Sequence, residues 1–189
     1  MCGSGAVIIG SGWGLLALLA VLPVFLWRRR GQLTSRRTLL GLAAIVYLDL
    51  LLSLTLLPFP LPPYQTFAGD CSMVLLLPFG TIWPAIQTPL DSPEWHFLAG
   101  NVLAFVPVGI LIPLLRPTDR RPWLTVLVVG FGLSLAIELG QLVGSLIVGF
   151  NYRQADVDDL IVNTVGAVAG YALLVGTKRL VGALATRPD

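Results

Sequence analysis

The feature that most constrains this chain is a series of apolar runs, each near the roughly 20 residues that a helix needs to cross a membrane. Five runs fit, at about Gly5–Trp27, Thr38–Pro58, Phe97–Leu115, Trp123–Val148 and Asp159–Thr177. The chain is 56% hydrophobic and 12% charged, and a soluble domain would have no means of burying that much apolar surface. The sequence therefore predicts an all-α fold, a polytopic transmembrane helix bundle forming one domain over residues 1–189.

The basic residues predict how this bundle lies in the membrane. Eleven of the 12 Lys and Arg fall in the loops 28–37 and 116–122 or in the tail after residue 177, and only Arg153 lies elsewhere. The positive-inside rule places those eleven in the cytoplasm, which puts the N-terminus outside and the C-terminus inside. The first run has its arginines after it rather than before it, so we expect a retained span and not a signal peptide. The expected location is the bacterial plasma membrane.

Two polar stripes stand out in these apolar segments. Ser134, Glu138, Gln141 and Ser145 share one helical face, and Asp156, Asp159, Asn163, Gly166 and Gly170 share another. A carboxylate at a helix centre in the membrane costs about 2.5–3.5 kcal/mol on insertion scales, so we expect the stripes to face each other rather than lipid. The pairs Gly140-x-x-x-Gly144 and Gly166-x-x-x-Gly170 favour close helix packing.

Helix depth predicts where the polar side chains meet. With a rise of about 1.5 Å per residue, those of the last three spans fall in the outer half of the membrane, and nothing comparable occurs in the inner half. The sequence therefore predicts a pocket open to the outside. Its predicted binding residues are Asn101, Glu138, Gln141, Arg153, Asp156, Asp159 and Asn163.

Several of these residues have two interpretations. Arg153 either reaches an anionic headgroup or, as we favour, pairs with Glu138, Asp156 or Asp159 to lock the loop. Asp158 lies off the polar face, and we expect it to be solvated. Asp49, in the middle of the second span, is either a candidate proton site or a hydrogen-bonding partner of a neighbouring helix.

The composition also bounds cofactors and partners. With one His and two Cys, the chain has no metal-ligand pattern, and we predict no metal, no other cofactor and no nucleic-acid partner. The acidic pocket favours a cation, an amine or a divalent metal over a bare phosphate. Its oxygen ligands would suit Mg²⁺ or Ca²⁺, but we favour helix capping by these carboxylates over metal binding. Cys2 and Cys71 are both predicted outside, where they either form a disulfide or stay as two thiols. The sequence leaves the oligomeric state open.

The long connection Phe59–His96 contains an apolar stretch, Met73–Trp83, interrupted by Pro78 and Gly80. At this length the stretch cannot cross the bilayer as a helix. We expect it either to lie in the membrane interface or to dip in as a re-entrant flap.

Five segments carry a resemblance to a known family. They are LTLLPF (54–59), LLPFGTI (76–82), NVLAFVPVGILIP (101–113), E-x-x-Q (138–141) and R-x-x-D-x-D-D-x-x-x-N-T-x-G (153–166). Over residues 40–175 the chain resembles the VanZ-like family of bacterial membrane proteins. The resemblance implies a helical membrane fold and the placing of the polar cluster, and the family's name-giving member is associated with resistance to the glycopeptide teicoplanin.

Three functions remain as alternatives. The first is a non-enzymatic envelope protein whose outer pocket binds a lipid headgroup, a wall precursor or a glycopeptide. The second is an intramembrane enzyme acting on an envelope lipid, with Glu138 or Asp159 as general base. The third is a small proton-coupled transporter using Asp49 and Glu138. The lack of a histidine pair or evident nucleophile disfavours the enzyme. The absence of polar residues in the inner half and of a visible inverted repeat disfavours the transporter. We therefore favour the first function, with membrane lipids as partners.

Overall fold

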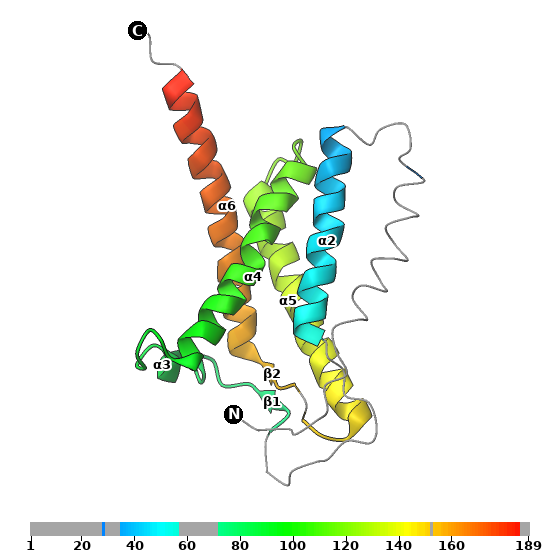
Figure 1. Ribbon diagram of the computed structural model, residues 1–189, viewed down its shortest axis with the longest axis vertical. Helices are drawn as coiled ribbons and strands as arrows, with labels where there is room; N and C mark the ends of the chain where they lie inside the picture. The colour runs from blue at the N-terminus through cyan, green and yellow to red at the C-terminus, as the bar shows by residue number, and fades with distance from the viewer. Residues whose placement is uncertain (1–27, 29–34, 57–71, 152, 186–189) are drawn as a thin grey trace. The chain divides into compact units, whose positions relative to one another are not determined.

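The computed structural model describes residues 28, 35–56, 72–151 and 153–185, which form helices and one pair of short strands (Figure 1). The elements, in chain order, are α2 (Arg36–Leu56), β1 (Val74–Leu75), α3 (Ile82–Ala85), α4 (Pro93–Leu115), α5 (Pro122–Val148), β2 (Ala155–Asp156) and α6 (Val157–Ala185). The all-α class predicted from the apolar runs is confirmed.

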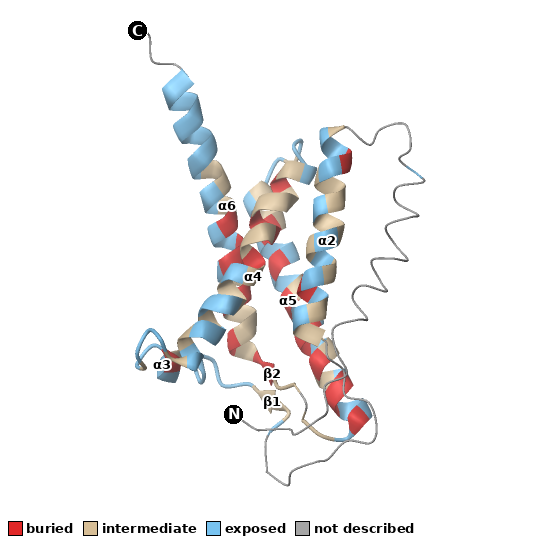
Figure 2. Cartoon of the chain, viewed as in Figure 1, coloured by how far each residue is buried: buried red, intermediate tan, exposed pale blue. Residues whose placement is uncertain are grey.

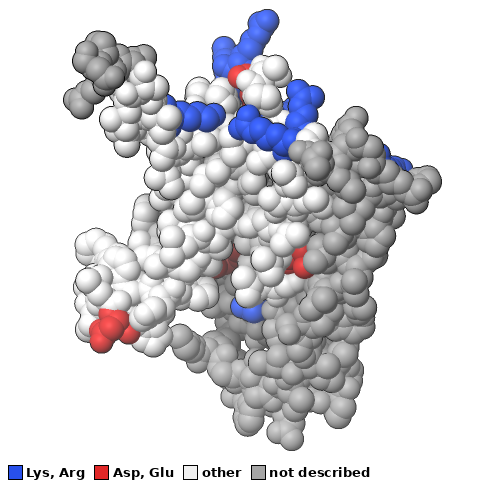
Figure 3. Space-filling view, turned by 45° about the horizontal axis from the view of Figure 1, so that its top comes forward, with Lys and Arg blue, Asp and Glu red and all other residues white. Residues whose placement is uncertain are grey.

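Within the described residues, four helices are long and apolar enough to cross a membrane: α2, α4, α5 and α6. They coincide with four of the predicted spans, and the fifth, Gly5–Trp27, lies outside the described residues. Large apolar side chains on them are exposed, for example Leu54 (71%), Leu103 (66%) and Ile147 (72%). Such continuous apolar exposure is typical of a surface that contacts lipid. On the face that Figure 3 shows, charged residues cover only small parts of the described surface.

The described chain divides into two compact units. Unit 1 comprises residues up to Pro78 together with Leu135–Val157, and unit 2 comprises Phe79–Ser134 and Asp158 onward. Unit 1 therefore holds α2, both strands and the C-terminal half of α5. Unit 2 holds α3, α4, the N-terminal half of α5 and nearly all of α6. The single domain over residues 1–189 stays a prediction.

In unit 1, a parallel strand pair joins the long connection to the segment between α5 and α6. Val74 pairs with Ala155 and Leu75 with Asp156. The Ala155 N–H donates to the Met73 carbonyl at 3.0 Å. Next to this pair, the Ser72 carbonyl accepts from Asn151 Nδ2 at 2.9 Å and from Gln154 Nε2 at 2.6 Å. These bonds fix the beginning of the stretch 73–83, in which sequence analysis expected no strand.

In unit 2, glycines bring the backbones of α4 and α6 into contact. A Cβ on Gly166 would overlap the Val102 carbonyl, and one on Gly170 would overlap the Val106 carbonyl. From the other side, a Cβ on Gly109 would overlap the Ala167 carbonyl. The predicted close packing at Gly166-x-x-x-Gly170 is confirmed, and it follows the small-residue rule for helices in membranes.

The buried face of α6 follows a helical stripe in its first half, as Figure 2 shows in red. Buried residues recur at Asp158, Val162, Asn163, Gly166, Ala167 and Gly170. Beyond Gly170, no described residue of α6 is buried. Asp158, Asp159 and Asn163 therefore lie on the part of α6 that packs against protein, whereas Thr177, Lys178 and Arg179 lie on its exposed part.

Candidate functional site

Glu138 anchors the polar residues of unit 1. Its side chain is 5% exposed, and Oε2 accepts the backbone N–H of Asp156 at 2.9 Å. Because Asp156 also belongs to β2, the Glu138 carboxylate holds the strand beside α5. Hydrogen bonds to a carboxylate are stronger than those between neutral groups, which suits an acid in an apolar helix. This contact joins one residue of each of the two polar stripes that the sequence analysis expected to face each other.

Gln141 and Arg153 act on the last described turn of α2. The final carbonyls of a helix have no partner within the helix, and buried carbonyls need one. Gln141 Nε2 donates to the Thr55 carbonyl at 3.0 Å, and Arg153 Nη2 donates to the Leu54 carbonyl at 3.3 Å. A guanidinium is also favourable near the negative end of a helix dipole. Both predicted site residues thus cap α2, whereas pairing of Arg153 with a carboxylate stays a prediction.

Ser145 closes the turn between α5 and β2. The side chain is fully buried, its Oγ donates to the Arg153 carbonyl at 2.8 Å, and the Arg153 N–H donates back at 3.4 Å. These reciprocal bonds fix the backbone from which the Arg153 side chain extends. The predicted stripe on α5 is confirmed, since Ser134, Glu138, Gln141 and Ser145 are all buried.

In unit 2, Asn101 on α4 contacts Asp159 on α6. Asn101 Nδ2 donates to Asp159 Oδ1 at 2.7 Å. Asp159 is half-buried near the start of α6, where a negative charge is also favoured by the helix dipole. The predicted meeting of these two side chains is confirmed, and the amide reduces the cost of an acid in an apolar segment.

Asn163 lies one turn further along α6. Its amide nitrogen makes a hydrogen bond, whereas its amide oxygen makes none with the described residues. Its side chain is 4% exposed, and Nδ2 donates to Ser134 Oγ at 2.9 Å. The Ser134 hydroxyl in turn contacts the Asp159 carbonyl at 3.5 Å. Asn163 Oδ1, however, is buried and accepts no hydrogen bond from any described residue. Such an acceptor is uncommon in folded proteins and calls for a donor.

The prediction that Asp158 is solvated is wrong. Asp158 is 1% exposed, and its carboxylate accepts the backbone N–H groups of Phe79, Thr81 and Ile82 at 2.5, 2.7 and 3.0 Å. The Thr81 hydroxyl adds a fourth bond at 2.7 Å. Asp158 belongs to the buried stripe of α6, because a segment far away in the sequence donates hydrogen bonds to its carboxylate.

The seven predicted site residues thus fall into two groups, one in each unit. Unit 1 holds Glu138, Gln141, Arg153 and Asp156, and unit 2 holds Asn101, Asp159 and Asn163. Several members of these networks lie outside the predicted site, among them Ser134 and Thr81. Signals for both were present, since Ser134 begins the polar stripe on α5 and Thr81 lies in the LLPFGTI motif. One outward pocket containing all seven stays a prediction.

Asp49 differs from the other acids of the spans. It lies in the middle of α2, is partly exposed, and receives no hydrogen bond from any described residue. Its role as a proton site stays a prediction. Among the described residues, no group of three or more His, Cys, Asp and Glu is placed to hold a metal ion.

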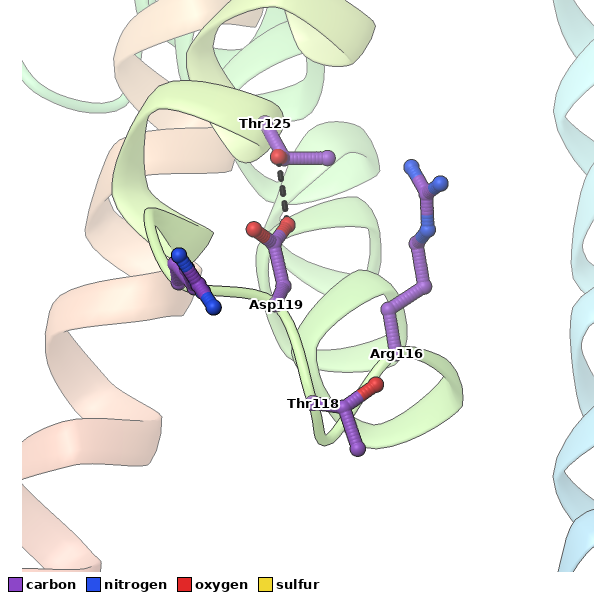
Figure 4. A pocket seen from close by; sticks show the side chains of 5 residues that line it. Arg116, Thr118, Asp119 and Thr125 are labelled. Atoms are coloured by element: carbon purple, nitrogen blue, oxygen red, sulfur yellow. Dashed lines mark hydrogen bonds between the residues drawn. The ribbon is translucent and has the colours of Figure 1, made fainter.

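A separate hollow lies at the connection between α4 and α5, and none of the predicted site residues lines it (Figure 4). It has a volume of about 410 Å³ and is lined by Arg116, Thr118, Asp119, Arg120 and Thr125. Asp119 accepts from the Thr125 hydroxyl at 2.5 Å and from the Arg121 N–H at 3.0 Å. These two bonds, in that order, hold the pKa of Asp119 below its usual value. The acid thereby fixes the loop at the start of α5.

The helices and their buried polar networks define a class: a polytopic helical membrane protein with hydrogen-bonded acids and amides inside its spans. The sequence profile of the VanZ/LLP1 family matches residues 44–180, which is most of the chain. The protein therefore belongs to the VanZ/LLP1 family, and the resemblance found in its motifs over residues 40–175 is confirmed. Searches of curated proteins and of solved structures find no significant match.

Proposed function

We propose that this chain is a non-enzymatic protein of the bacterial plasma membrane that binds the headgroup of an envelope compound. The ligand would be a lipid, a wall precursor or a glycopeptide that presents N–H or O–H donors. The observation that carries this proposal is the open acceptor Asn163 Oδ1, which is buried on α6 without a partner among the described residues. Leaving such a group unpaired costs about 1–3 kcal/mol, which a donor from a ligand would offset.

The surroundings of Asn163 favour the same ligand chemistry. Asp159 lies one turn away on α6, and its carboxylate is held by the Asn101 amide. A carboxylate and an amide oxygen together suit an amine or a hydroxyl and disfavour a bare phosphate. Ethanolamine headgroups, amino sugars and the peptide part of glycopeptides all carry such donors.

The state of Glu138 supports binding over catalysis. As a general base, Glu138 would need a free carboxylate oxygen within reach of a substrate proton. Its Oε2 already accepts the Asp156 N–H, and this contact favours a structural role for the acid in unit 1. No comparable observation favours the enzyme or the transporter, and we propose neither.

The test compares binding to the wild-type chain and to Asn163→Leu in nanodiscs of phosphatidylcholine, whose headgroup has no N–H or O–H donor. The probes are phosphatidylethanolamine, a lipid-linked disaccharide-pentapeptide and teicoplanin, each titrated separately. We expect at least one probe to bind the wild type and to lose about tenfold in affinity, or about 1.4 kcal/mol, with Asn163→Leu. Binding of no probe by the wild type, or equal binding by both proteins, would contradict the proposal.

Two control variants separate a lost ligand contact from a damaged fold. Thr164→Val alters the next residue, whose hydroxyl donates to the Leu160 carbonyl of its own helix. Ser134→Ala removes the partner of Asn163 Nδ2 but keeps the Oδ1 acceptor. Both should bind the probe within about threefold of wild type, because neither removes the group that accepts from the ligand.

A further inference from the structure

The segment from Phe79 to Leu90, here called the flap, exposes large apolar side chains at its surface. Phe79 is 58% exposed, Trp83 63% and Leu90 78%. The sequence from residue 72 to residue 90 contains no Asp, Glu, Lys or Arg. The surface at the lower left of Figure 3, which belongs to α3 and its neighbours, is uncharged apart from one acidic patch. An uncharged apolar surface of this kind indicates a contact with something other than water.

The flap is held firmly at its first end. The Asp158 carboxylate accepts four hydrogen bonds from Phe79, Thr81 and Ile82, and Asp158 is almost completely buried. The Asp158 carboxylate lies at the start of α3, where the backbone N–H groups have no partner within the helix. The exposed apolar residues are therefore presented on an ordered backbone.

The second end of the flap is fixed to the start of α4. Trp95 Nε1 donates to the Thr88 carbonyl at 3.1 Å, and the Thr88 and Ser92 hydroxyls are 2.7 Å apart. Ser92 also caps α4 by accepting the Trp95 N–H at 3.3 Å. Since α4 is a candidate membrane span, these bonds tie the flap to the point where the chain enters the membrane.

The backbone at Phe79 has an unusual conformation. Its φ is 64°, in the left-handed region that side chains other than glycine rarely adopt. Such a conformation costs free energy and persists where the surroundings enforce it, often at functional positions. Here the Phe79 N–H donates to Asp158, so the same carboxylate that holds the flap also holds this conformation.

We propose that the flap is a membrane anchor: Phe79 and Trp83 insert into the interface of the leaflet in which α4 begins, and Asp158 is the positioning residue that holds them there. The partner is the lipid surface. Both helices that flank the long connection, α2 and α4, are candidate spans, so the connection begins and ends at the membrane. Exposed Trp and Phe side chains in a segment that itself contains no Asp, Glu, Lys or Arg suit the headgroup boundary. This inference is independent of the proposed function, since the flap and Asp158 share no residue with the Asn163 network.

The test measures how deep the flap lies in lipid, using the full chain with Cys2→Ser and Cys71→Ser. A fluorescent label is attached at Trp83→Cys in vesicles of phosphatidylethanolamine and phosphatidylglycerol, and quenching by nitroxide lipids is compared with quenching by aqueous iodide. The matched control carries the label at Thr118→Cys, an exposed position in the α4–α5 connection. We expect nitroxide lipids to quench the label at position 83 at least about twofold more than the label at position 118.

The role of Asp158 is tested in the same vesicles. Asp158→Ala should lower the nitroxide quenching at position 83 by about half or more, because four hydrogen bonds that place the flap are lost. Thr81→Val, which removes one of the four bonds without touching the carboxylate, should give a smaller decrease in a chain that still folds. Equal iodide quenching at positions 83 and 118 would overturn the anchor. Protection of position 83 from both quenchers would also overturn it, because that result indicates that another protein covers the flap. Unchanged lipid quenching in both variants would overturn the positioning role.

Discussion

At the scale of single residues, Asp158 and Asn163 show that burial alone does not mark a binding residue. Both are more than nine-tenths buried on the first turns of α6. Asp158 has donors all around its carboxylate, whereas Asn163 keeps an acceptor open. The satisfied group is suited to holding the fold and the open one to receiving a ligand. This difference is the reason for assigning the two residues different roles.

A prediction at this scale concerns the hydrogen bond between Thr125 and Asp119. The Thr125 hydroxyl is the first cause of the lowered pKa of Asp119, so Thr125→Val should raise that pKa toward its usual value. Thr118→Val, at the same hollow, should leave it unchanged. Titration of the Asp119 carboxyl carbon by NMR checks this, and equal midpoints in the wild type and Thr125→Val would contradict it.

The lowered pKa also fixes the direction of a pH effect. Because folded Asp119 releases its proton more readily than an unfolded chain does, the ionised acid stabilises the loop fully above the usual Asp pKa. That stabilisation is lost as the pH falls through the lowered value. Protection of the Arg121 amide, which donates to Asp119, should therefore persist at neutral and mildly acidic pH and decrease only in strong acid.

At the scale of helices, the contact between α4 and α6 depends on glycines that leave no room for a Cβ. Gly170→Ala would place a methyl group on the Val106 carbonyl, so the two backbones would have to separate. We expect a loss of about 1–3 kcal/mol in the free energy of unfolding, typical of overpacking. The matched control is Gly176→Ala on the same helix, where a Cβ meets nothing within 4 Å.

The control Gly176→Ala should leave the free energy of unfolding unchanged or raise it by up to about 1 kcal/mol, because Ala favours helix more than Gly does. Unfolding of both variants in mixed detergent micelles, followed by circular dichroism, measures the difference. Equal stabilities of Gly170→Ala and Gly176→Ala would show that the tight contact between α4 and α6 does not contribute to the fold.

Helical periodicity explains what could be predicted from the sequence at this scale. Four spans, the buried stripe on α5 and the glycine face of α6 follow from spacing within one segment. The contacts of Asp158 with Phe79, Thr81 and Ile82 join positions nearly 80 residues apart, and the β1–β2 pair is only two residues long. These long-range contacts produce no periodic pattern in the sequence. From helical spacing alone, a residue outside the polar stripe is expected to face solvent or lipid. Asp158 was misjudged for that reason.

At the scale of the whole molecule, the chain is a member of the VanZ/LLP1 family with four candidate spans in its described part. Its polar side chains are mostly engaged with one another: acids accept backbone N–H groups, and amide and guanidinium groups cap a helix end. Polar groups inside a membrane need such hydrogen bonds within the protein, because the lipid offers no water to bond with. Two buried amide oxygens of the described residues lack a partner, Asn151 Oδ1 before β2 and Asn163 Oδ1 on α6. The proposed binding function depends on the second, which lies within a candidate span.

The most direct measurement is an experimental structure of the full chain in nanodiscs of native bacterial lipids. We predict density for a headgroup whose N–H or O–H atom lies about 2.7–3.2 Å from Asn163 Oδ1. A single water filling that position, or lipid acyl chains alone beside Asn163, would contradict the account.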